Sequence, residues 1–131
     1  MKYLLDVNVL VALLIQAHEH HDAAEAWAAA LDRSDQVLLC SWTEIGFVRV
    51  SLAAGYVPDI DLARRALEAF RAGKAEVAFV ADDRRAAHLP DWVTTPAQTS
   101  DGHLASLAVS CDAKLATFDG RLTGAYAIPR N

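Results

Sequence analysis

Short apolar segments typical of buried strands alternate with longer segments of helical periodicity along the whole chain. The strand-like segments are residues 3–5, 37–40, 76–80, 114–118 and 126–128. The helix-like segments between them are residues 7–17, 21–31, 42–54, 61–72 and 100–110. Apolar strands separated by helices are typical of an α/β fold with a mostly parallel sheet. The sequence therefore predicts a sheet covered by helices.

The length and the apolar content fit one folded domain. The chain has 131 residues, of which 53% are apolar and 22% are charged. That apolar fraction is enough for a packed core and excludes a disordered chain, and the length argues against two domains. We therefore expect a single domain over residues 1–131. Its net charge of −5 excludes a generally basic surface for nucleic acids, although a local basic patch is still allowed.

Neither disulfide chemistry nor membrane insertion is indicated. Cys40 and Cys111 lie far apart and match no disulfide framework or zinc pattern. The apolar start of the chain is interrupted by Asp6 and Asn8, and it lacks the basic start and cleavage site of a signal peptide. No run reaches the roughly 18 uncharged apolar residues that a membrane span needs. The expected location is the cytoplasm.

Four acidic residues stand at positions that a parallel sheet brings to one edge. Asp6 ends the first strand-like segment and Asp119 follows the fourth. Glu44 and Asp101 fall in the first turns of two predicted helices. In right-handed parallel units, the carboxyl ends of strands and the amino ends of helices lie along the same rim. The four carboxylates are therefore expected to converge.

Each of these acids also has an ordinary structural explanation. Asp6 can cap the helix after it, and Glu44 can complete a capping box begun by Ser41. Asp101 can complement a helix dipole, and Asp119 can form a turn. Four like charges on one rim would nevertheless repel one another, and a divalent cation removes that conflict. Mg²⁺ and Mn²⁺ prefer such oxygen ligands, and the resulting site can activate water and stabilise charge on a phosphate.

Four short motifs contain these acids. They are Leu4-Leu5-Asp6-Val7-Asn8, Trp42-Thr43-Glu44, Ser100-Asp101-Gly102-His103-Leu104-Ala105 and Leu115-Ala116-Thr117-Phe118-Asp119. In this order and at this spacing they resemble the PIN-domain ribonucleases, and within that family the VapC-type toxins of bacterial toxin–antitoxin pairs. The resemblance covers nearly the whole chain. It implies a three-layer α/β/α PIN-like domain with a mostly parallel central sheet of four to five strands.

The resemblance also implies a role for six residues. The catalytic acids would be Asp6, Glu44, Asp101 and Asp119. Of these, Asp6, Asp101 and Asp119 would be the metal ligands, whereas Glu44 would act partly through water. Asn8 and Thr117 match supporting positions of the family and would orient the carboxylates by hydrogen bonds.

The implied activity is that of a Mg²⁺-dependent endoribonuclease, with Mn²⁺ as an alternative ion. The implied reaction is cleavage of RNA phosphodiesters by metal-activated water, in a toxin held inactive by its cognate antitoxin. The implied partners are an RNA substrate, a VapB-type antitoxin and a second copy of the chain in a homodimer, without a membrane.

The chain departs from the family pattern at two positions. Some members carry a further acid shortly after the fourth one, and Arg121 stands here two positions on. That leaves a four-carboxylate site and removes a ligand for a second tightly held ion. Gly102 follows Asp101 where a better helix former is expected, although its cost in a first turn is small.

Other chemistry-bearing side chains are interpreted structurally. His18, His20 and His21 match no zinc spacing and are expected in a solvated connection between helices. Asp82 is expected to cap the turn that follows it, and His103 to be exposed on its helix. The residues available for phosphate contacts are Arg49, Arg64, Arg65, Arg84, Arg85 and Lys114.

Proteins of other classes share parts of this pattern. A receiver-type signalling domain would need paired acids after the first strand, and a haloacid dehalogenase-type phosphatase would need Asp-x-Asp there. This chain has Asp6-Val7-Asn8 at that place. A nuclease for DNA flaps stays open, although the chain has no obvious extra elements for gripping a duplex. A non-catalytic PIN-like binding module also stays open, and the four intact acids argue against it.

Overall fold

The computed structural model describes residues 1–73 and 76–130 and contains one five-stranded sheet. The strands are β1 (Lys2–Leu5), β2 (Gln36–Leu39), β3 (Val77–Phe79), β4 (Lys114–Thr117) and β5 (Tyr126–Ala127). The α-helices are α1 (Val7–Leu14), α2 (His21–Ala30), α3 (Ser41–Ala53), α4 (Ile60–Arg71) and α5 (Thr99–Ser110). Two short 3₁₀ helices, η1 (Ala86–His88) and η2 (Pro96–Gln98), precede α5. The predicted α/β class is confirmed.

The strand order of the sheet is β3-β2-β1-β4-β5, and every pairing is parallel. The chain builds outward from β1 through β2 to β3, and then returns to add β4 on the other side of β1. Leu4 on the central strand is therefore paired with Leu38 on one side and Leu115 on the other. The strand order reverses between β1 and β4, which is where open parallel sheets place their binding crevice.

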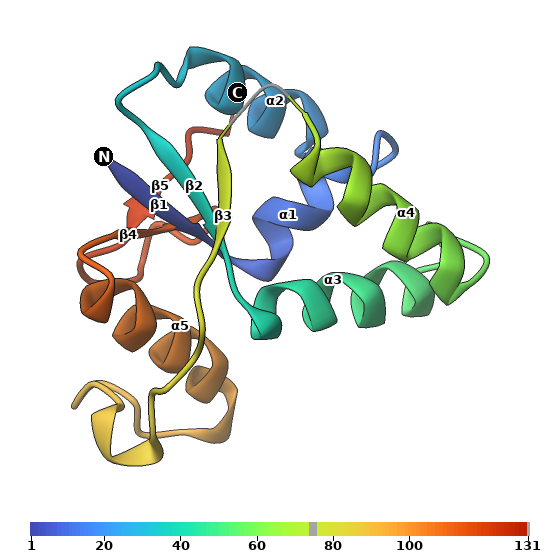
Figure 1. Cartoon of the computed structure of the whole chain (residues 1–131). Helices are drawn as coiled ribbons and strands as arrows, with labels where there is room; N and C mark the ends of the chain where they lie inside the picture. The colour runs from blue at the N-terminus through green and yellow to red at the C-terminus, as the bar shows by residue number, and fades with distance from the viewer. Residues whose placement is uncertain (74–75, 131) are drawn as a thin grey trace.

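Alternating side chains of the strands feed two separate hydrophobic cores. Leu5 and Leu39 point into a large core with α1 to α4, and Leu4 and Leu38 point into a smaller core with α5. This period of two is the pattern of a sheet covered on both faces. Figure 1 shows α5 on one side of the sheet and α1, α3 and α4 on the other. The three-layer α/β/α arrangement is thus confirmed.

The first helix is shorter than the sequence predicts. The expected helix over residues 7–17 ends at Leu14, because the backbone of Ile15 is extended (φ −110°, ψ 106°). Ile15 is buried in the large core, and the chain then turns so that the His18 amide donates to the Ile15 carbonyl. The burial of Ile15 thus ends the helix early and leaves residues 16–20 as a connection beside the sheet.

The inward face of α4 agrees only in part with the pattern of its sequence, which predicts Leu62, Ala66, Ala69 and Phe70 inward. Ala66 and Phe70 are partly buried against the large core, whereas Leu62 and Ala69 are exposed, with Leu62 at 42%. The buried residues are Ala63 and Leu67. Both sets of positions satisfy the spacing of an amphipathic helix, so the choice depends on the packing partner rather than on periodicity.

Gly46 marks the closest contact between two helices of the large core. A Cβ atom at this position would lie 2.5 Å from Cγ2 of Val7, so only glycine lets α3 approach the start of α1 this closely. None of the described helices is long and apolar enough to cross a membrane.

Candidate active site

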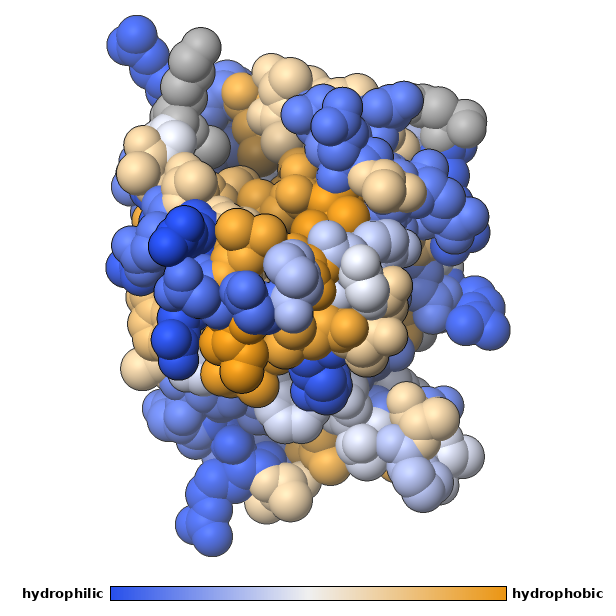
Figure 2. Space-filling model, turned by 90° about the vertical axis from the view of Figure 1, so that its right-hand side faces the viewer, coloured by the Kyte–Doolittle hydropathy of each residue, from blue (hydrophilic) through white to orange (hydrophobic). Residues whose placement is uncertain are grey.

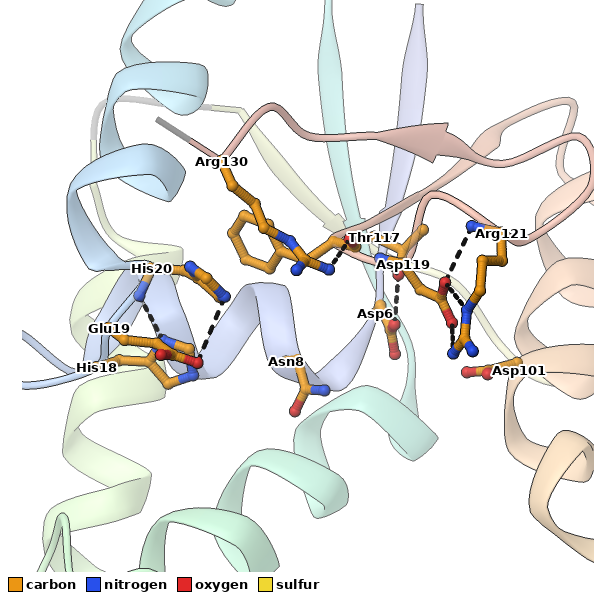
Figure 3. Close-up of a pocket in the computed structure, with 11 residues that line it drawn as sticks. Asp6, Asn8, His18, Glu19, His20, Asp101, Thr117, Asp119, Arg121 and Arg130 are labelled. Carbon is orange, nitrogen blue, oxygen red and sulfur yellow. Dashed lines mark hydrogen bonds and ion pairs between the residues drawn. The ribbon is translucent and has the colours of Figure 1, made fainter.

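A cavity of about 610 Å³ lies where β1 and β4 end, at the reversal of strand order. Asp6, Asp101 and Asp119 line it together, and Asn8 and Thr117 also contribute to its wall. Five of the six predicted site residues therefore share one cavity (Figure 3). The sixth, Glu44, does not line this cavity.

Asp6 is held in place by hydrogen bonds of its backbone amide and of both carboxylate oxygens. Its backbone amide donates to the Ala116 carbonyl at 3.0 Å, which extends the pairing of β1 with β4. One carboxylate oxygen accepts from the Val7 amide at 2.7 Å and caps α1. The other accepts from Oγ1 of Thr117 at 2.8 Å. Asp6 is thus both a helix cap and a cavity residue with a fixed orientation.

Thr117 connects two of the acids. Besides donating to Asp6, its hydroxyl oxygen accepts a hydrogen bond from the Asp119 amide at 3.1 Å. The side chain itself is buried. The last residue of β4 thereby fixes the Asp6 carboxylate and the backbone of Asp119.

The pKa values of Asp6 and Asp101 are both raised above the ordinary aspartate range. Burial is the largest cause for each carboxyl group. The charge of Asp119 raises both pKa values further, and the charge of Asp101 also raises that of Asp6. The expected repulsion is present, but it is secondary to the loss of hydration.

Asp119 departs from this pattern because Arg121 neutralises it. The guanidinium donates to both carboxylate oxygens, from Nε at 3.0 Å and from Nη2 at 3.1 Å. The Arg121 amide also donates to the same carboxylate at 2.9 Å, which closes the turn after β4. Hydrogen bonding to Arg121 lowers the pKa of Asp119 to about 2. Among the described ion pairs, Asp6 and Asp101 therefore have no cationic partner, whereas Asp119 is paired with Arg121.

Glu44 lies in the first turn of α3, which is anchored to the end of β1. Oγ1 of its buried neighbour Thr43 donates to the Leu5 carbonyl at 2.8 Å. The predicted capping box is wrong, because Ser41 is already helical and Cys40 takes the cap position. Within the described residues, Cys40 makes no side-chain cap bond, since its thiol meets Thr43 instead. Glu44 is therefore not used as a cap.

Asp101 is carried by the first turn of α5, at a place of close packing. The buried Gly102 explains the unexpected glycine, because a Cβ atom there would overlap Val93. The segment around Val93 thereby lies directly against α5. Asp101 faces the cavity from this helix, opposite the strand ends (Figure 3).

The donor set suits a hard divalent cation, but the described side chains do not form a complete metal site. Carboxylate oxygens in one cavity, with two pKa values raised, are what Mg²⁺ or Mn²⁺ would bind and stabilise. Among the described residues, no three His, Cys, Asp or Glu side chains are grouped closely enough to hold an ion. Asn8 is exposed and makes no side-chain hydrogen bond within that part of the chain. The carboxylates of the cavity therefore suit Mg²⁺ or Mn²⁺ chemically. The third of them, Asp119, is paired with Arg121 in this structure.

The sequence interpretation missed several side chains of the cavity. His18, Glu19 and His20 line it opposite the acids, together with Phe118 and Arg130. The histidines are therefore not simply a solvated connection, because the early end of α1 turns this segment toward the strand ends. Only their clustering in the sequence signalled a site.

Asp82 and His103 form a pair that the sequence did not predict. Asp82 does cap its turn, accepting a hydrogen bond from the Arg84 amide at 3.0 Å. His103, however, is partly buried, since its Nε2 pairs with the Asp82 carboxylate and its ring packs near Trp42.

The chain is similar in sequence to known proteins over most of its length. The model of the PIN domain family matches residues 3–127. Ribonuclease VapC38 of Mycobacterium tuberculosis is 39% identical in an alignment of 123 positions that covers 88% of this chain and 84% of that protein. Ribonuclease VapC29 of the same organism is 33% identical in an alignment of 132 positions that covers 93% of this chain and 89% of that protein.

The fold is similar to that of a solved structure as well. A chain in the crystal structure of VapBC2 from Rickettsia felis bound to a DNA fragment from their promoter matches with a TM-score of 0.65. The match covers 97% of each chain at 14% sequence identity, so it bears on the fold alone.

Proposed function

This chain belongs to the PIN-domain family and is of the VapC type, and from that premise we propose that it is a Mg²⁺-dependent endoribonuclease and the toxin of a toxin–antitoxin pair. One observation carries the proposal. Asp6, Asp101 and Asp119 come from three distant segments and line one cavity at the reversal of strand order. Curated relatives that are similar over most of the chain are named ribonucleases.

Asp6 and Asp101 would hold the ion, with Asp119 as a third ligand when Arg121 moves aside. The bound ion would supply a Lewis acid that lowers the pKa of water and offsets phosphate charge. Thr117 keeps the Asp6 carboxylate in place through its hydrogen bond. Asp6 and Asp101 are partly buried, which reduces competition from water and strengthens their interaction with a cation.

Two arginines at the cavity would bind the phosphate backbone of RNA. Arg121 is highly exposed, with 91% of its side chain accessible, so its guanidinium can exchange Asp119 for a phosphate. Arg130 lines the same cavity and donates to the carbonyl of Phe118, the residue before Asp119, so its charge lies near the acids. These cations explain how a chain of net charge −5 can bind a polyanion at one place. Glu44, outside this cavity, would act only through water.

The proposed partners are a VapB-type antitoxin and a second copy of the chain, in the cytoplasm. The side of the molecule turned toward the viewer in Figure 2 carries an apolar area among hydrophilic ones. Exposed apolar side chains of α3 and α4 include Ile45, Ile60 and Leu62. Apolar surface of this kind is usual where another protein binds.

The experiment that tests this function is cleavage of total bacterial RNA by the purified protein. New 5′ ends, mapped by sequencing, should form in Mg²⁺ or Mn²⁺, disappear in chelator and return when the ion is added in excess. Co-expression with a small neighbouring reading frame should restore growth that the chain alone inhibits. Cleavage that proceeds fully in chelator would contradict the metal-dependent mechanism.

A further inference from the structure

Four aromatic rings form a continuous file that leads from the surface into the cavity. The ring of Tyr56 lies 6.3 Å from that of His18, between centroids. His18 lies 5.7 Å from His20, and His20 lies 4.9 Å from Phe118. We call these four residues the ring file. Three of them come from connections between helices, and the fourth directly follows β4.

The exposure of the ring file falls from its outer end to its inner end. Tyr56 is 38% exposed, the His20 side chain is 25% exposed and Phe118 is 7% exposed. His18, His20 and Phe118 all line the cavity that holds the acids. Figure 3 shows His18 and His20 on the side of the cavity opposite Asp101 and Arg121. The rings therefore form a second wall that the acidic site does not use.

Local hydrogen bonds hold this wall in place. The His20 amide donates to Nδ1 of His18 at 3.0 Å, so this nitrogen carries no proton. Burial lowers the pKa of His18, which favours a neutral ring at pH 7. Arg130 donates to the Phe118 carbonyl at 2.6 Å, which sets a cation at the inner end of the file. The wall thus combines flat rings with one fixed positive charge.

We propose that the accessible rings of the ring file are a stacking platform for the bases of single-stranded RNA, that the buried Phe118 supports His20, and that Arg130 binds the phosphate at the inner end. The proposal rests on the proposed ribonuclease function and adds a base-binding subsite outside the acidic residues. Stacking on aromatic side chains needs bases that are free of a duplex. The Glu19 carboxylate lies 3.5 Å from Nε2 of His20, and its negative charge disfavours phosphates beside the outer rings.

The test measures binding separately from cleavage. A fluorescein-labelled 12-nucleotide RNA pool of random sequence is titrated in Mg²⁺ with Asp101→Asn protein, and anisotropy gives Kd across a range of salt concentrations. Adding His20→Ala should raise Kd about fivefold or more without changing the salt dependence, as expected for loss of one stacked base. His20→Tyr should restore the affinity. Arg130→Gln should reduce the slope of log Kd against log salt by about 0.7, as expected for one phosphate contact on a single strand.

Matched controls come from the rest of the chain. His88→Ala changes a histidine of η1, and Arg33→Gln changes an arginine at the amino ends of the strands; neither residue lines the cavity. Both should bind the RNA pool like the parent. Thermal melting of every variant confirms folding, and His20→Tyr keeps the test valid if His20→Ala is unstable.

The outcomes separate this inference from the proposed function. If the wild type cleaves RNA but His20→Ala binds the pool like its parent, the stacking platform is overturned and the nuclease stands. If the wild type cleaves no RNA but His20→Ala and Arg130→Gln weaken binding as stated, the platform stands and the nuclease fails. Equal losses on a blunt 12-base-pair RNA duplex would also overturn the inference, because bases in a duplex cannot stack on the rings.

Discussion

Arg121 determines how much of the acidic cluster is available to a cation. It engages both oxygens of Asp119, whereas Asp6 and Asp101 are partly buried carboxylates without a cationic partner among the described ion pairs. Its partner Asp119 has a lowered pKa, whereas the pKa values of Asp6 and Asp101 are raised. The arginine two positions after the fourth acid therefore distinguishes this chain from a simple four-carboxylate site.

Replacing Arg121 by Gln should increase the stabilisation that Mg²⁺ gives. Without the ion pair Asp119 becomes a free ligand, so the rise in melting temperature on adding Mg²⁺ should exceed that of the wild type. Arg65→Gln is the matched control, because it breaks a similar exposed pair with Asp61 on α4. An equal rise in all three proteins would show that Arg121 does not compete with the ion.

The raised pKa values of Asp6 and Asp101 predict how stability changes with pH in chelator. A carboxyl whose pKa is higher in the folded state contributes stability that is present below the unfolded value of about 4 and lost as pH rises through the folded value. Asp119 contributes the opposite trend, with stability lost as pH falls from about 4 toward its folded pKa of about 2. Asp6→Asn should therefore melt at a higher temperature than the wild type at pH 7, and lose that advantage near pH 4. Melting curves between these two pH values decide it, and a wild type more stable than Asp6→Asn at pH 7 would contradict the account.

The sequence predicted the elements better than their ends and faces. The strands were predictable because each is a short apolar segment between helical patterns, and parallel pairing followed from their alternation with helices. The end of α1 was not, because it depends on the burial of Ile15 in a core formed by distant segments. The orientation of α4 likewise depended on which neighbour it packs against.

The same distinction holds within the site. Asp6, Asp101 and Asp119 could be brought together from the sequence because strand and helix ends meet on one rim. The bond from Arg121 to Asp119 could not, since it depends on side-chain conformation in a turn. The histidine wall also could not, because it follows from the early end of α1.

At the level of elements, Gly46 is the position where a small change should matter most. Gly46→Ala should lower the free energy of unfolding by about 1–3 kcal/mol, because the new methyl group would overlap Val7 and force α1 and α3 apart. Gly120→Ala is the control, since nothing lies within 4 Å of its Cβ position. Chemical denaturation measures both. Equal stability of the two variants would show that the helices adjust freely.

The molecule as a whole carries a net charge of −5, and three of its aspartates, Asp6, Asp101 and Asp119, line the same cavity. Mg²⁺ should therefore stabilise the folded state, because its ligands converge only there. Free ion at a hundredfold excess over Kd adds about 2.7 kcal/mol to the free energy of unfolding. Thermal melting at pH 7 with increasing Mg²⁺ should show this rise, and Asp101→Asn should reduce it. A melting temperature indifferent to the ion would argue that the acids do not act together.

The most direct test of the account compares RNA cleavage by the wild type, Asp6→Asn and Asp61→Asn at the same Mg²⁺ concentration. Asparagine caps helices about as well as aspartate, so Asp6→Asn keeps the fold and changes the carboxylate. Loss of a metal ligand should remove several kcal/mol of stabilisation from the reaction and slow cleavage about a hundredfold or more. Asp61→Asn, on the exposed face of α4, should cleave like the wild type. If folded Asp6→Asn cleaves RNA at the wild-type rate, the acidic cavity is not the active site.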